Sequence, residues 1–482
     1  MTIPSEPARP NILLICTDQQ RYDAVRAYGN DHVQTPNLDR LARDGVLFEN
    51  CYVQNPVCAP SRATLMTSRY PHAHGLWANG VQLPDQEQFF TKALADDGYD
   101  CGLVGKLHLS ACKDGRLEPR HDDGFRVFRW AHDPYPGSSE NQYHRWLRAK
   151  YPELYDQALE GGGFDNLPTE AHYSRWVGNE TVDFLRSARD RTKPFCFIAN
   201  FFDPHHGFGA PKEYLDRYVA DDLPRPVTRD GELAGKPPIL TEASKESYAG
   251  HARGYTTYTE DELQQTKAAY YAMVSLVDDE VGRILDALEA EGLAGNTIVV
   301  FTSDHGEMLG DHQLMLKGPM MYECAVRVPL IVRWPGQLPA GERRSELVQW
   351  IDLAPTFLDA AGVPPLPHGQ GTSLLPLARG DEDAVPRGWA LCEYRNSGHP
   401  YDPAVHTTML RADRWKLVVY HGAPATDRER TGELYDLVAD PDELDNLWDA
   451  PGHREVRFAL QEQLLDVLVA TEDRSQLRLD HY

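Results

Sequence analysis

The chain has 482 residues, of which 41% are hydrophobic and 25% charged, and its formal net charge is −25 at pH 7. These proportions are ordinary for a soluble enzyme, and the length suggests one large α/β domain plus a smaller one, or up to three domains. Such an acidic chain is a poor match for nucleic acid or an anionic membrane surface, because both need a basic protein face. A small anionic substrate stays compatible, since nearby lysines, histidines and a metal set the potential of a site.

The N-terminal residues, the apolar runs and the cysteines bear on the cellular compartment. Residues 1–10 have no basic region followed by an apolar stretch, so we predict no signal peptide. No apolar run reaches the length of a membrane span. The eight cysteines are scattered without a CxxC pair, which disfavours a disulfide framework or a zinc ribbon. We therefore expect a cytoplasmic protein.

Apolar strands and amphipathic helices alternate along the chain. The apolar runs that predict strands buried on both faces are residues 11–16, 195–202 and 297–302. Helices are expected at about 36–44 and 265–291, because their apolar side chains recur at the helical period. This alternation predicts an α/β fold with a large, mixed but mostly parallel sheet sandwiched by helices.

The later part of the chain has a different pattern. Residues 206–261 are rich in Pro, Gly and Tyr with weak periodicity, so we interpret them as an insertion that shapes a substrate site. A small α+β unit is predicted from short strands and a terminal helix, at residues 388–394, 407–411, 415–420 and 456–468. We place the catalytic α/β domain at 1–375 and the smaller C-terminal domain, with a short antiparallel sheet and terminal helix, at 376–482.

Polar side chains follow each of the three buried strands. Asp18, His205 and Asp304 stand just beyond the carboxyl ends of these strands. Open α/β sheets bind their ligands at that edge. Any one of the three alone would be an ordinary loop or helix-cap residue, but three such clusters in one sheet predict a site.

A cysteine stands at the predicted start of a helix. Residues 58–67 read Cys-Ala-Pro-Ser-Arg-Ala-Thr-Leu-Met-Thr, and Pro60 can begin a helix that places Cys58 at or just before its N-terminus. Backbone N–H groups and the helix dipole favour an anion at that position. Without the rest of the motif, Cys58 would be interpreted as a buried free thiol.

This Cys-x-Pro-Ser-Arg segment, followed by Ala-Thr-Leu-Met-Thr, resembles the signature of the type I sulfatases of the alkaline phosphatase superfamily. Other family patterns recur in order across nearly the whole chain. They are Pro10-Asn-Ile-Leu with Asp18, Gly105-Lys106-Leu107-His108, Pro204-His205, Ser303-Asp304-His305-Gly306-Glu307, Lys317 ahead of Tyr322-Glu323, and residues 434–447. The resemblance implies an alkaline phosphatase-like fold.

The resemblance also implies the reaction. In that family a separate maturation enzyme reads Cys-x-Pro-x-Arg and oxidises the cysteine to formylglycine, here at Cys58. One hydroxyl of the aldehyde hydrate attacks sulfur, and the other expels sulfate by reforming the aldehyde. The implied substrate is a small anionic sulfate monoester, which is cleaved to an alcohol and sulfate. The maturation enzyme is the implied protein partner, and a homo-oligomer is compatible with the sequence.

One divalent metal ion is implied at Asp18, Gln19, Cys58, Asp304 and His305. The carboxylates favour Ca²⁺, which is the expected ion. His305 stands where many sulfatases have Asn, and Gln19 replaces the second Asp of the commoner Asp-Asp pair. Both changes lower the negative charge of the metal site. An imidazole ligand also suits Mn²⁺, which is the alternative ion. Gln19 is interpreted equally as a ligand or as a neighbour that only approaches the metal.

Family analogy assigns the other catalytic side chains. Arg62 and Lys106 would hold the hydrate and the sulfate oxygens, and His108 would take the proton during elimination. His205 and Lys317 would lie on the leaving-group side, where one of them donates to the departing oxygen. A neutral-range imidazole can serve as an acid or a base there.

Two other functions stay open. Phosphonate monoester hydrolases and phosphodiesterases share Asp-Gln and Asp-His with this chain, and a similarly placed Asn contacts substrate in the former. Asn79 is therefore either a substrate-binding residue or a turn residue in Ala78-Asn79-Gly80. Gly105-Lys106-Leu107-His108 favours a sulfatase, since those relatives lack it. A non-catalytic binding protein without a converted Cys58 is the third interpretation, and the intact motifs argue against it.

Overall fold

The fold is seen in a computed structural model that describes residues 9–112, 117–135, 139–422 and 430–474. An eight-stranded mixed sheet lies at its centre, with the strand order β10-β2-β9-β8-β1-β5-β3-β4. Its strands are β1 (Asn11–Thr17), β2 (Val46–Tyr52), β3 (Asp100–Gly105), β4 (Phe125–Trp130), β5 (Phe195–Asn200), β8 (Thr297–Ser303), β9 (Arg327–Arg333) and β10 (Glu342–Gln349). Five neighbouring strands from β8 to β4 run parallel, and only β9 is antiparallel to its neighbours. The predicted fold class is confirmed.

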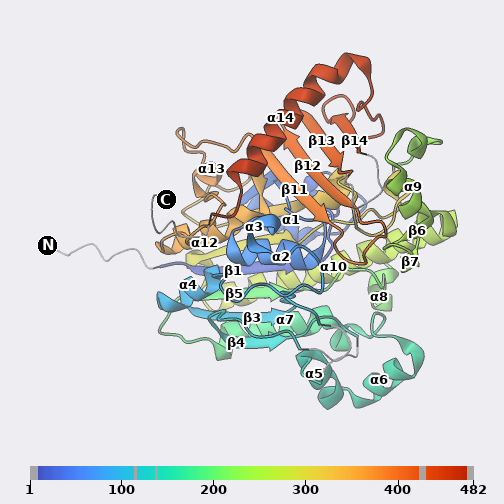
Figure 1. The fold of residues 1–482 in the computed structure, drawn as a ribbon. Coiled ribbons are helices and arrows are strands. Elements are labelled where there is room, and N and C mark those ends of the chain that lie inside the picture. The colour runs from blue at the N-terminus through green and yellow to red at the C-terminus, as the bar shows by residue number, and fades with distance from the viewer. Residues whose placement is uncertain (1–8, 113–116, 136–138, 423–429, 475–482) are drawn as a thin grey trace.

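Helices cover both faces of this sheet (Figure 1). On β1, Leu13 and Ile15 pack into one core cluster while Ile12 and Leu14 pack into the other. One face is covered by α1 (Pro36–Arg43), α7 (Tyr173–Asp183) and α10 (Glu260–Ala290), and the other by α2 (Cys58–Thr67), α4 (Phe90–Asp96) and α12 (Leu353–Ala361). Burial on both faces explains why these strands read as continuous apolar runs rather than alternating ones.

The long helix α10 begins five residues before the predicted start at residue 265. Thr259 caps it, and the side chains of Thr259 and Glu262 form a reciprocal capping box. Such a Thr-x-x-Glu pattern is a sequence signal for a helix start. The apolar periodicity begins only after this polar first turn, so periodicity alone placed the start too late.

Residues 206–261 contain α8 (Lys212–Leu215), α9 (Pro238–Lys245) and a two-stranded hairpin of β6 (Glu246–Ser247) and β7 (Ala252–Arg253). The other short helices of the chain are α3 (Pro71–His74), α5 (Gln142–Lys150), α6 (Pro152–Gln157), α11 (Glu323–Val326) and α13 (Leu375–Arg379).

The C-terminal part is a four-stranded antiparallel sheet with one long helix on its face (Figure 1). Its elements are β11 (Trp389–Arg395), β12 (His406–Ala412), β13 (Trp415–Tyr420), β14 (Thr431–Asp436) and α14 (Arg454–Ala470). Leu460, Leu464 and Val467 of α14 pack on this sheet. The predicted helix and three strands are present, whereas β14 was not predicted. The domain boundary at residue 375 stays a prediction.

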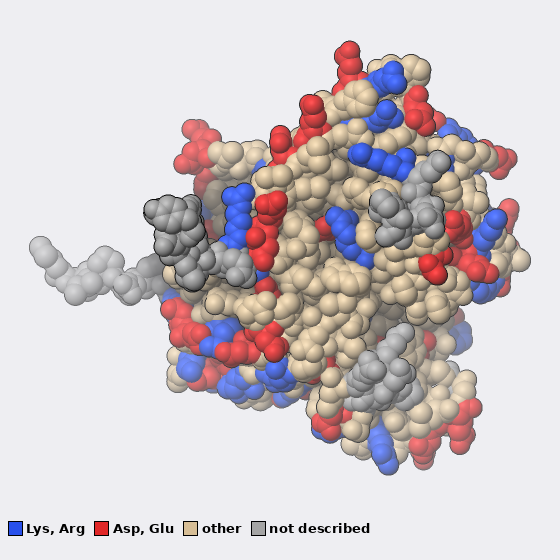
Figure 2. Space-filling view, viewed as in Figure 1, with Lys and Arg blue, Asp and Glu red and all other residues tan. Residues whose placement is uncertain are grey.

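Charged side chains of both signs are interspersed around the rim of the face shown in Figure 2, whose centre is covered mainly by other residues. Among the described residues, no helix is both long enough and apolar enough to span a membrane. All eight cysteines are described, and each is free and buried.

A buried lysine joins the C-terminal sheet to the central domain. Lys416 on β13 is fully buried, and its Nζ lies 2.7 Å from Oε1 of Glu323 and 2.7 Å from Oε1 of Glu443. It also donates to the carbonyl of Met321, at 2.9 Å. Burial alone would raise the pKa of Glu323, but Lys416 and Arg327 lower it below its ordinary value. These contacts fix the segment that follows Lys317.

Lys416→Met should lower the free energy of unfolding by about 3–5 kcal/mol, because it leaves two carboxylates buried without their cation. Chemical denaturation at neutral pH measures this loss. The pKa of Glu323 is lowered in the folded state, so its ion pair with Lys416 stabilises the fold above the unfolded-state pKa of about 4.3. This stabilisation is lost as the pH falls below that value. The difference in unfolding free energy between wild type and Lys416→Met should therefore become smaller in acid. Lys212→Met, at an exposed i,i+4 pair, is the control; an equal loss there would contradict this assignment.

Candidate active site

Four parallel strands deliver polar residues to one edge of the sheet. Thr17 pairs with Ser303, and Asn200 pairs with both Cys16 and Gly105. The residues that follow β1, β8, β3 and β5 therefore emerge side by side. They include Asp18, Asp304, Lys106 and His205. The sequence prediction of a site at this edge rested on three of these strands.

Cys58 is the first residue of α2, and its side chain points into the same edge. The preceding Val57 is extended, and the helix begins at Cys58 as its proline pattern predicts. Cys58 Sγ lies 3.0 Å from Nζ of Lys317 and 3.1 Å from Nε2 of His305. Its distance to Oδ1 of Asp18 is 3.6 Å. Cys58 is 1% exposed, so a small molecule can reach the thiol only through the cavity.

Asp18 and Asp304 are each held by a cation through one carboxylate oxygen. Arg62 Nε donates to Oδ2 of Asp304 at 2.8 Å, and Lys106 Nζ donates to Oδ2 of Asp18 at 2.6 Å. A second nitrogen of Arg62 reaches Oδ2 of Asp18 at 3.3 Å. The Oδ1 atoms of both carboxylates lie 3.6 Å from Nε2 of His305. The Oδ1 atoms thus face the imidazole together.

These Oδ1 atoms belong to a four-residue group whose chemistry suits a metal ion. The donor atoms of Asp18, Cys58, Asp304 and His305 all lie within 4.8 Å of one another, and all four residues are buried. Two hard oxygens fit Ca²⁺, and the imidazole nitrogen extends the fit to Mn²⁺. The described residues therefore fit the divalent ion expected from the sequence.

Gln19 lies beside this group but has other partners. Its Oε1 accepts a hydrogen bond from Lys317 Nζ at 2.7 Å, and its Nε2 donates to Glu307. An ion at the four-residue group would have to compete with Lys317 for this oxygen. The contacts favour the interpretation of Gln19 as a neighbour that positions Lys317. Glu307 is fully buried, and no site role was predicted for it beyond its place in the Ser303–Glu307 motif.

The charges of the site support one another. Burial and Asp18 raise the pKa of the Cys58 thiol, but Lys106, Lys317 and other cations lower it overall. Burial also opposes the charge of Lys317, yet Cys58 and Asp18 raise its pKa. The result is a locally cationic environment around Cys58, despite the net charge of the chain.

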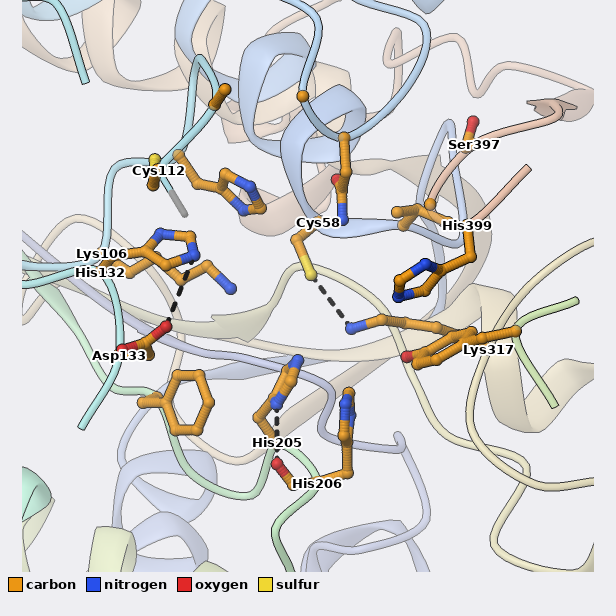
Figure 3. Close-up of a pocket in the computed structure, with 18 of the residues that line it drawn as sticks. Cys58, Lys106, Cys112, His132, Asp133, His205, His206, Lys317, Ser397 and His399 are labelled. Atoms are coloured by element: carbon orange, nitrogen blue, oxygen red, sulfur yellow. Dashed lines mark hydrogen bonds and ion pairs between the residues drawn. The ribbon is translucent and has the colours of Figure 1, made fainter. Parts of the chain in front are cut away.

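Cys58 lines a cavity of about 500 Å³, and Figure 3 shows the side chains around it. Cys58, Lys106, Lys317, Asn79, His108 and His205 all line it, together with His206. Burial lowers the pKa of His108 and of His205 well below the ordinary value, so both imidazoles are neutral. Asn79 Oδ1 accepts a hydrogen bond from the backbone of Ala59, which fixes the amide at the start of α2.

Other residues of the cavity wall were missed by sequence reasoning. His132 follows β4, a strand that was not predicted, so its position at the sheet edge gave no signal. Ser397 and His399 come from the loop after β11, far along the chain. Tyr248 belongs to the 206–261 segment, which was expected to shape the substrate site.

Comparison with known families identifies the chain. Residues 10–363 match the family model described as Sulfatase, and residues 310–470 match the one described as N-sulphoglucosamine sulphohydrolase, C-terminal. The chain belongs to the sulfatase family. This confirms the resemblance seen in the motifs, and by this membership the protein is a sulfuric ester hydrolase. Sulfatases generally use a metal ion and a formylglycine made from cysteine, and the buried four-residue group is suited to both.

Individual relatives of this sulfatase include both expected classes. It is 31% identical to an arylsulfatase of Clostridium perfringens over 483 residues, covering 96% of this chain and 95% of the relative. The phosphonate monoester hydrolase of Agrobacterium radiobacter has a TM-score of 0.82 at 28% identity, covering 97% of both chains. A structure in complex with its substrate D-glucosamine-2-N,6-O-disulfate has a TM-score of 0.78 at 25% identity, covering 97% of this chain and 99% of that one.

Replacing His305 should change which metal the protein prefers. His305→Asn replaces the imidazole nitrogen by the amide oxygen of a shorter side chain, so affinity for Mn²⁺ should fall more than affinity for Ca²⁺. Isothermal titration calorimetry of chelator-treated protein with each ion measures the ratio of the Mn²⁺ affinity to the Ca²⁺ affinity. His206→Asn, on the cavity wall outside the four-residue group, is the matched control. An unchanged Mn²⁺/Ca²⁺ ratio in His305→Asn would show that His305 is not a ligand.

Proposed function

We propose that this enzyme hydrolyses sulfate monoesters to an alcohol and sulfate, with a formylglycine made from Cys58 as the nucleophile. The position of Cys58 carries this proposal. It lies at the N-terminus of α2, at the base of the cavity, within 3.1 Å of both Lys317 and His305. The same side chain belongs to the buried four-residue group and to the Cys-x-Pro-Ser-Arg motif.

Conversion of Cys58 would supply an aldehyde hydrate, with one hydroxyl to attack sulfur and a second to release sulfate. A divalent ion, when bound, would acidify the attacking hydroxyl and neutralise sulfate oxygens. Asp18, Asp304 and His305 would hold that ion, and Gln19 would keep Lys317 in place beside it. We assign Arg62 and Lys106 to balancing the charge of Asp18 and Asp304. Lys106 also lines the cavity, so it would lie beside the bound sulfate.

The proton transfers fall to histidines and a lysine on the cavity wall. Neutral His108 can accept the proton of the second hydroxyl during elimination. We assign His205 to the leaving-group side, and its Nδ1 donates to the carbonyl of His206 at 3.0 Å. That hydrogen bond leaves Nε2 of His205 for the substrate (Figure 3). His205 must be protonated before it can act as an acid, and a bound sulfate anion would raise its pKa. Lys317 is the alternative donor, because it is already charged.

Phosphonate monoester hydrolysis is the second candidate. The structural similarity to the Agrobacterium radiobacter enzyme, the Gln19 and His305 substitutions and the position of Asn79 in the cavity favour it. The presence of Lys106 and His108 in the cavity favours sulfate, because the Gly105–His108 motif that carries them resembles the sulfatase pattern.

The two candidates are separated by paired substrates with one leaving group. Turnover of nitrophenyl sulfate should exceed that of the nitrophenyl phosphonate monoester in kcat/KM, and Cys58→Ala should abolish both activities. Cys392→Ala, a buried cysteine of the C-terminal sheet, is the matched control. Mass spectrometry of the peptide containing residue 58 shows whether the wild type carries formylglycine. Near-native turnover in Cys58→Ala would overturn the nucleophile, and a preference for the phosphonate would reverse the substrate class.

His205→Ala should slow esters of basic alcohols far more than esters of acidic phenols. A general acid matters only when the departing oxygen is basic, and its contribution is about 10²–10⁴ in rate. A series of sulfate esters with increasing leaving-group pKa measures this effect, and the dependence of rate on that pKa should become steeper. Equal losses across the series would mean that His205 positions the substrate. The acid role would then pass to Lys317 or His206.

A further inference from the structure

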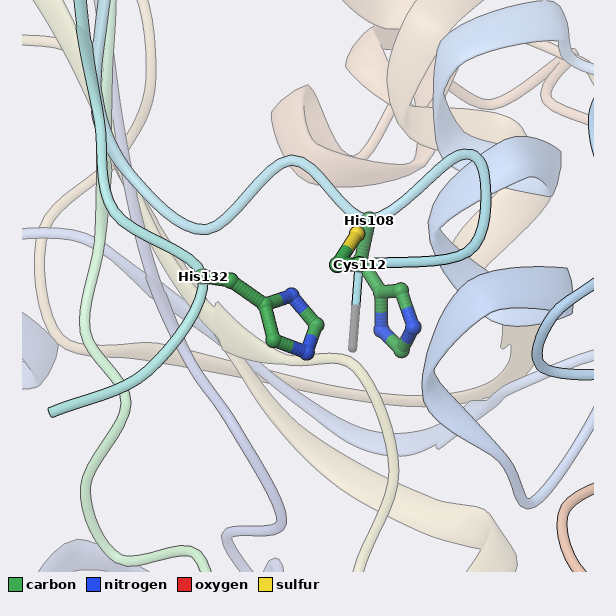
Figure 4. Close-up of side chains that lie close together, drawn as sticks. All are labelled: His108, Cys112 and His132. Carbon is green, nitrogen blue, oxygen red and sulfur yellow. The ribbon is translucent and has the colours of Figure 1, made fainter. Parts of the chain in front are cut away.

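A second cluster of metal-ligating side chains lies on the cavity wall. It consists of His108, Cys112 and His132, whose donor atoms all lie within 4.8 Å of one another (Figure 4). None of the three belongs to the Asp18–Cys58–Asp304–His305 group. Each is at most 9% exposed, and the two imidazole rings meet edge to face with their centroids 4.5 Å apart.

We propose that His108, Cys112 and His132 form a second metal site, which takes ions that prefer nitrogen and sulfur ligands, such as Zn²⁺ or Cu⁺. Two imidazoles and a thiolate are the donors that these ions select, whereas Ca²⁺ selects oxygen. On binding, the Cys112 thiol releases its proton to solvent as the metal–sulfur bond forms. Each imidazole donates a lone pair, and no electron is transferred.

Buried hydrogen bonds hold together the two segments that carry these side chains. His108 and Cys112 lie on the loop after β3, and His132 follows β4. The buried carboxylate of Glu118 joins these segments, because it accepts hydrogen bonds from the backbone N–H of His108 and from Trp130 Nε1, both at 3.0 Å. The loop and the strand end therefore stay together when the site is empty.

The donors also have coordination capacity and an entry path. His108 Nδ1 is buried without a hydrogen-bond partner in the described part of the chain. Asp133 Oδ2 lies 3.8 Å from Nε2 of His132, and a carboxylate beside a ligand histidine commonly orients it. All three ligands line the cavity, so an ion and a completing water can enter from solvent.

The donor atoms need a small adjustment to close on an ion. Tetrahedral bonds of about 2.0–2.3 Å place two nitrogens, or a nitrogen and a sulfur, roughly 3.3–3.6 Å apart. Separations of up to 4.8 Å must therefore shorten by about 1 Å, which side-chain rotation at the cavity surface can provide.

Occupation of this site would silence the enzyme. A metal bound to His108 takes the lone pair that we assign to proton abstraction during sulfate release, and this consequence rests on the proposed function. Metal binding itself does not depend on it. The cavity would then contain one ion site that supports turnover and a second that blocks it.

Cobalt binding tests the site independently of activity. The probe is Co²⁺ added to calcium-loaded Cys58→Ala protein, in which the four-residue group has no thiol. One Co²⁺ per chain should bind with a thiolate-to-cobalt charge-transfer absorption. The band should disappear in Cys58→Ala/Cys112→Ser and persist in Cys58→Ala/Cys101→Ser, which removes a buried thiol from β3. Absence of the band in Cys58→Ala, or its persistence without Cys112, would overturn the proposal. Retained calcium binding shows that each variant is folded, and His132→Ala provides a second ligand deletion.

Zinc titration of the active, calcium-loaded enzyme tests the inhibitory consequence. Each protein is compared with its own zinc-free activity. Wild type should lose about 10²-fold in turnover, the size of a typical proton-transfer contribution, and Cys112→Ser should resist the same free Zn²⁺ concentration. Equal inhibition of both proteins would place the inhibitory ion elsewhere. Cobalt binding at Cys112 without zinc inhibition would overturn the assigned role of His108 while the metal site stands.

Discussion

Two fully buried carboxylates, Asp18 and Asp304, lie at the ends of adjacent parallel strands, and the rest of the site depends on how their charge is balanced. A charge taken out of water is costly unless an opposite charge and hydrogen bonds accompany it. Arg62 and Lys106 meet this need from α2 and from the end of β3. Because Arg62 and Lys106 contact only the Oδ2 atoms, the Oδ1 atoms remain turned toward His305. The pairing that stabilises the fold is thus the one that shapes the candidate metal group.

Lys317 depends on a part of the chain that is remote from this sheet edge. Its segment continues to Met321 and Glu323, which contact the buried Lys416 of the C-terminal sheet. Ser397 and His399, from the loop after β11, complete the cavity wall. The base of the cavity therefore comes from the central sheet, and part of its rim comes from the C-terminal sheet. Such a division permits the rim to vary while Cys58 keeps its surroundings.

The sequence was informative where local chemistry dictates structure. Strands β1, β5 and β8 were predicted because both of their faces are covered, and Cys58 was placed at a helix start because Pro60 follows it. The unpredicted parts depend on contacts between distant residues. The burial of Lys416 between Glu323 and Glu443 has no local pattern, and neither does the meeting of His132 with Cys112. Strand β14 was overlooked because its residues were considered only as a family pattern.

The burial of Cys58 would impose an order of events on its conversion to the proposed nucleophile. The folded chain leaves the thiol 1% exposed and Arg62 3% exposed, both within the first turns of a packed helix. An enzyme that reads residues 58 to 62 along an extended backbone would find neither in the finished fold. If Cys58 is converted as we propose, the modification must reach the nascent or unfolded chain before α2 packs. The yield of active protein would then be set by a race between two rates, and a faster-folding variant could be more stable and yet carry less of the nucleophile.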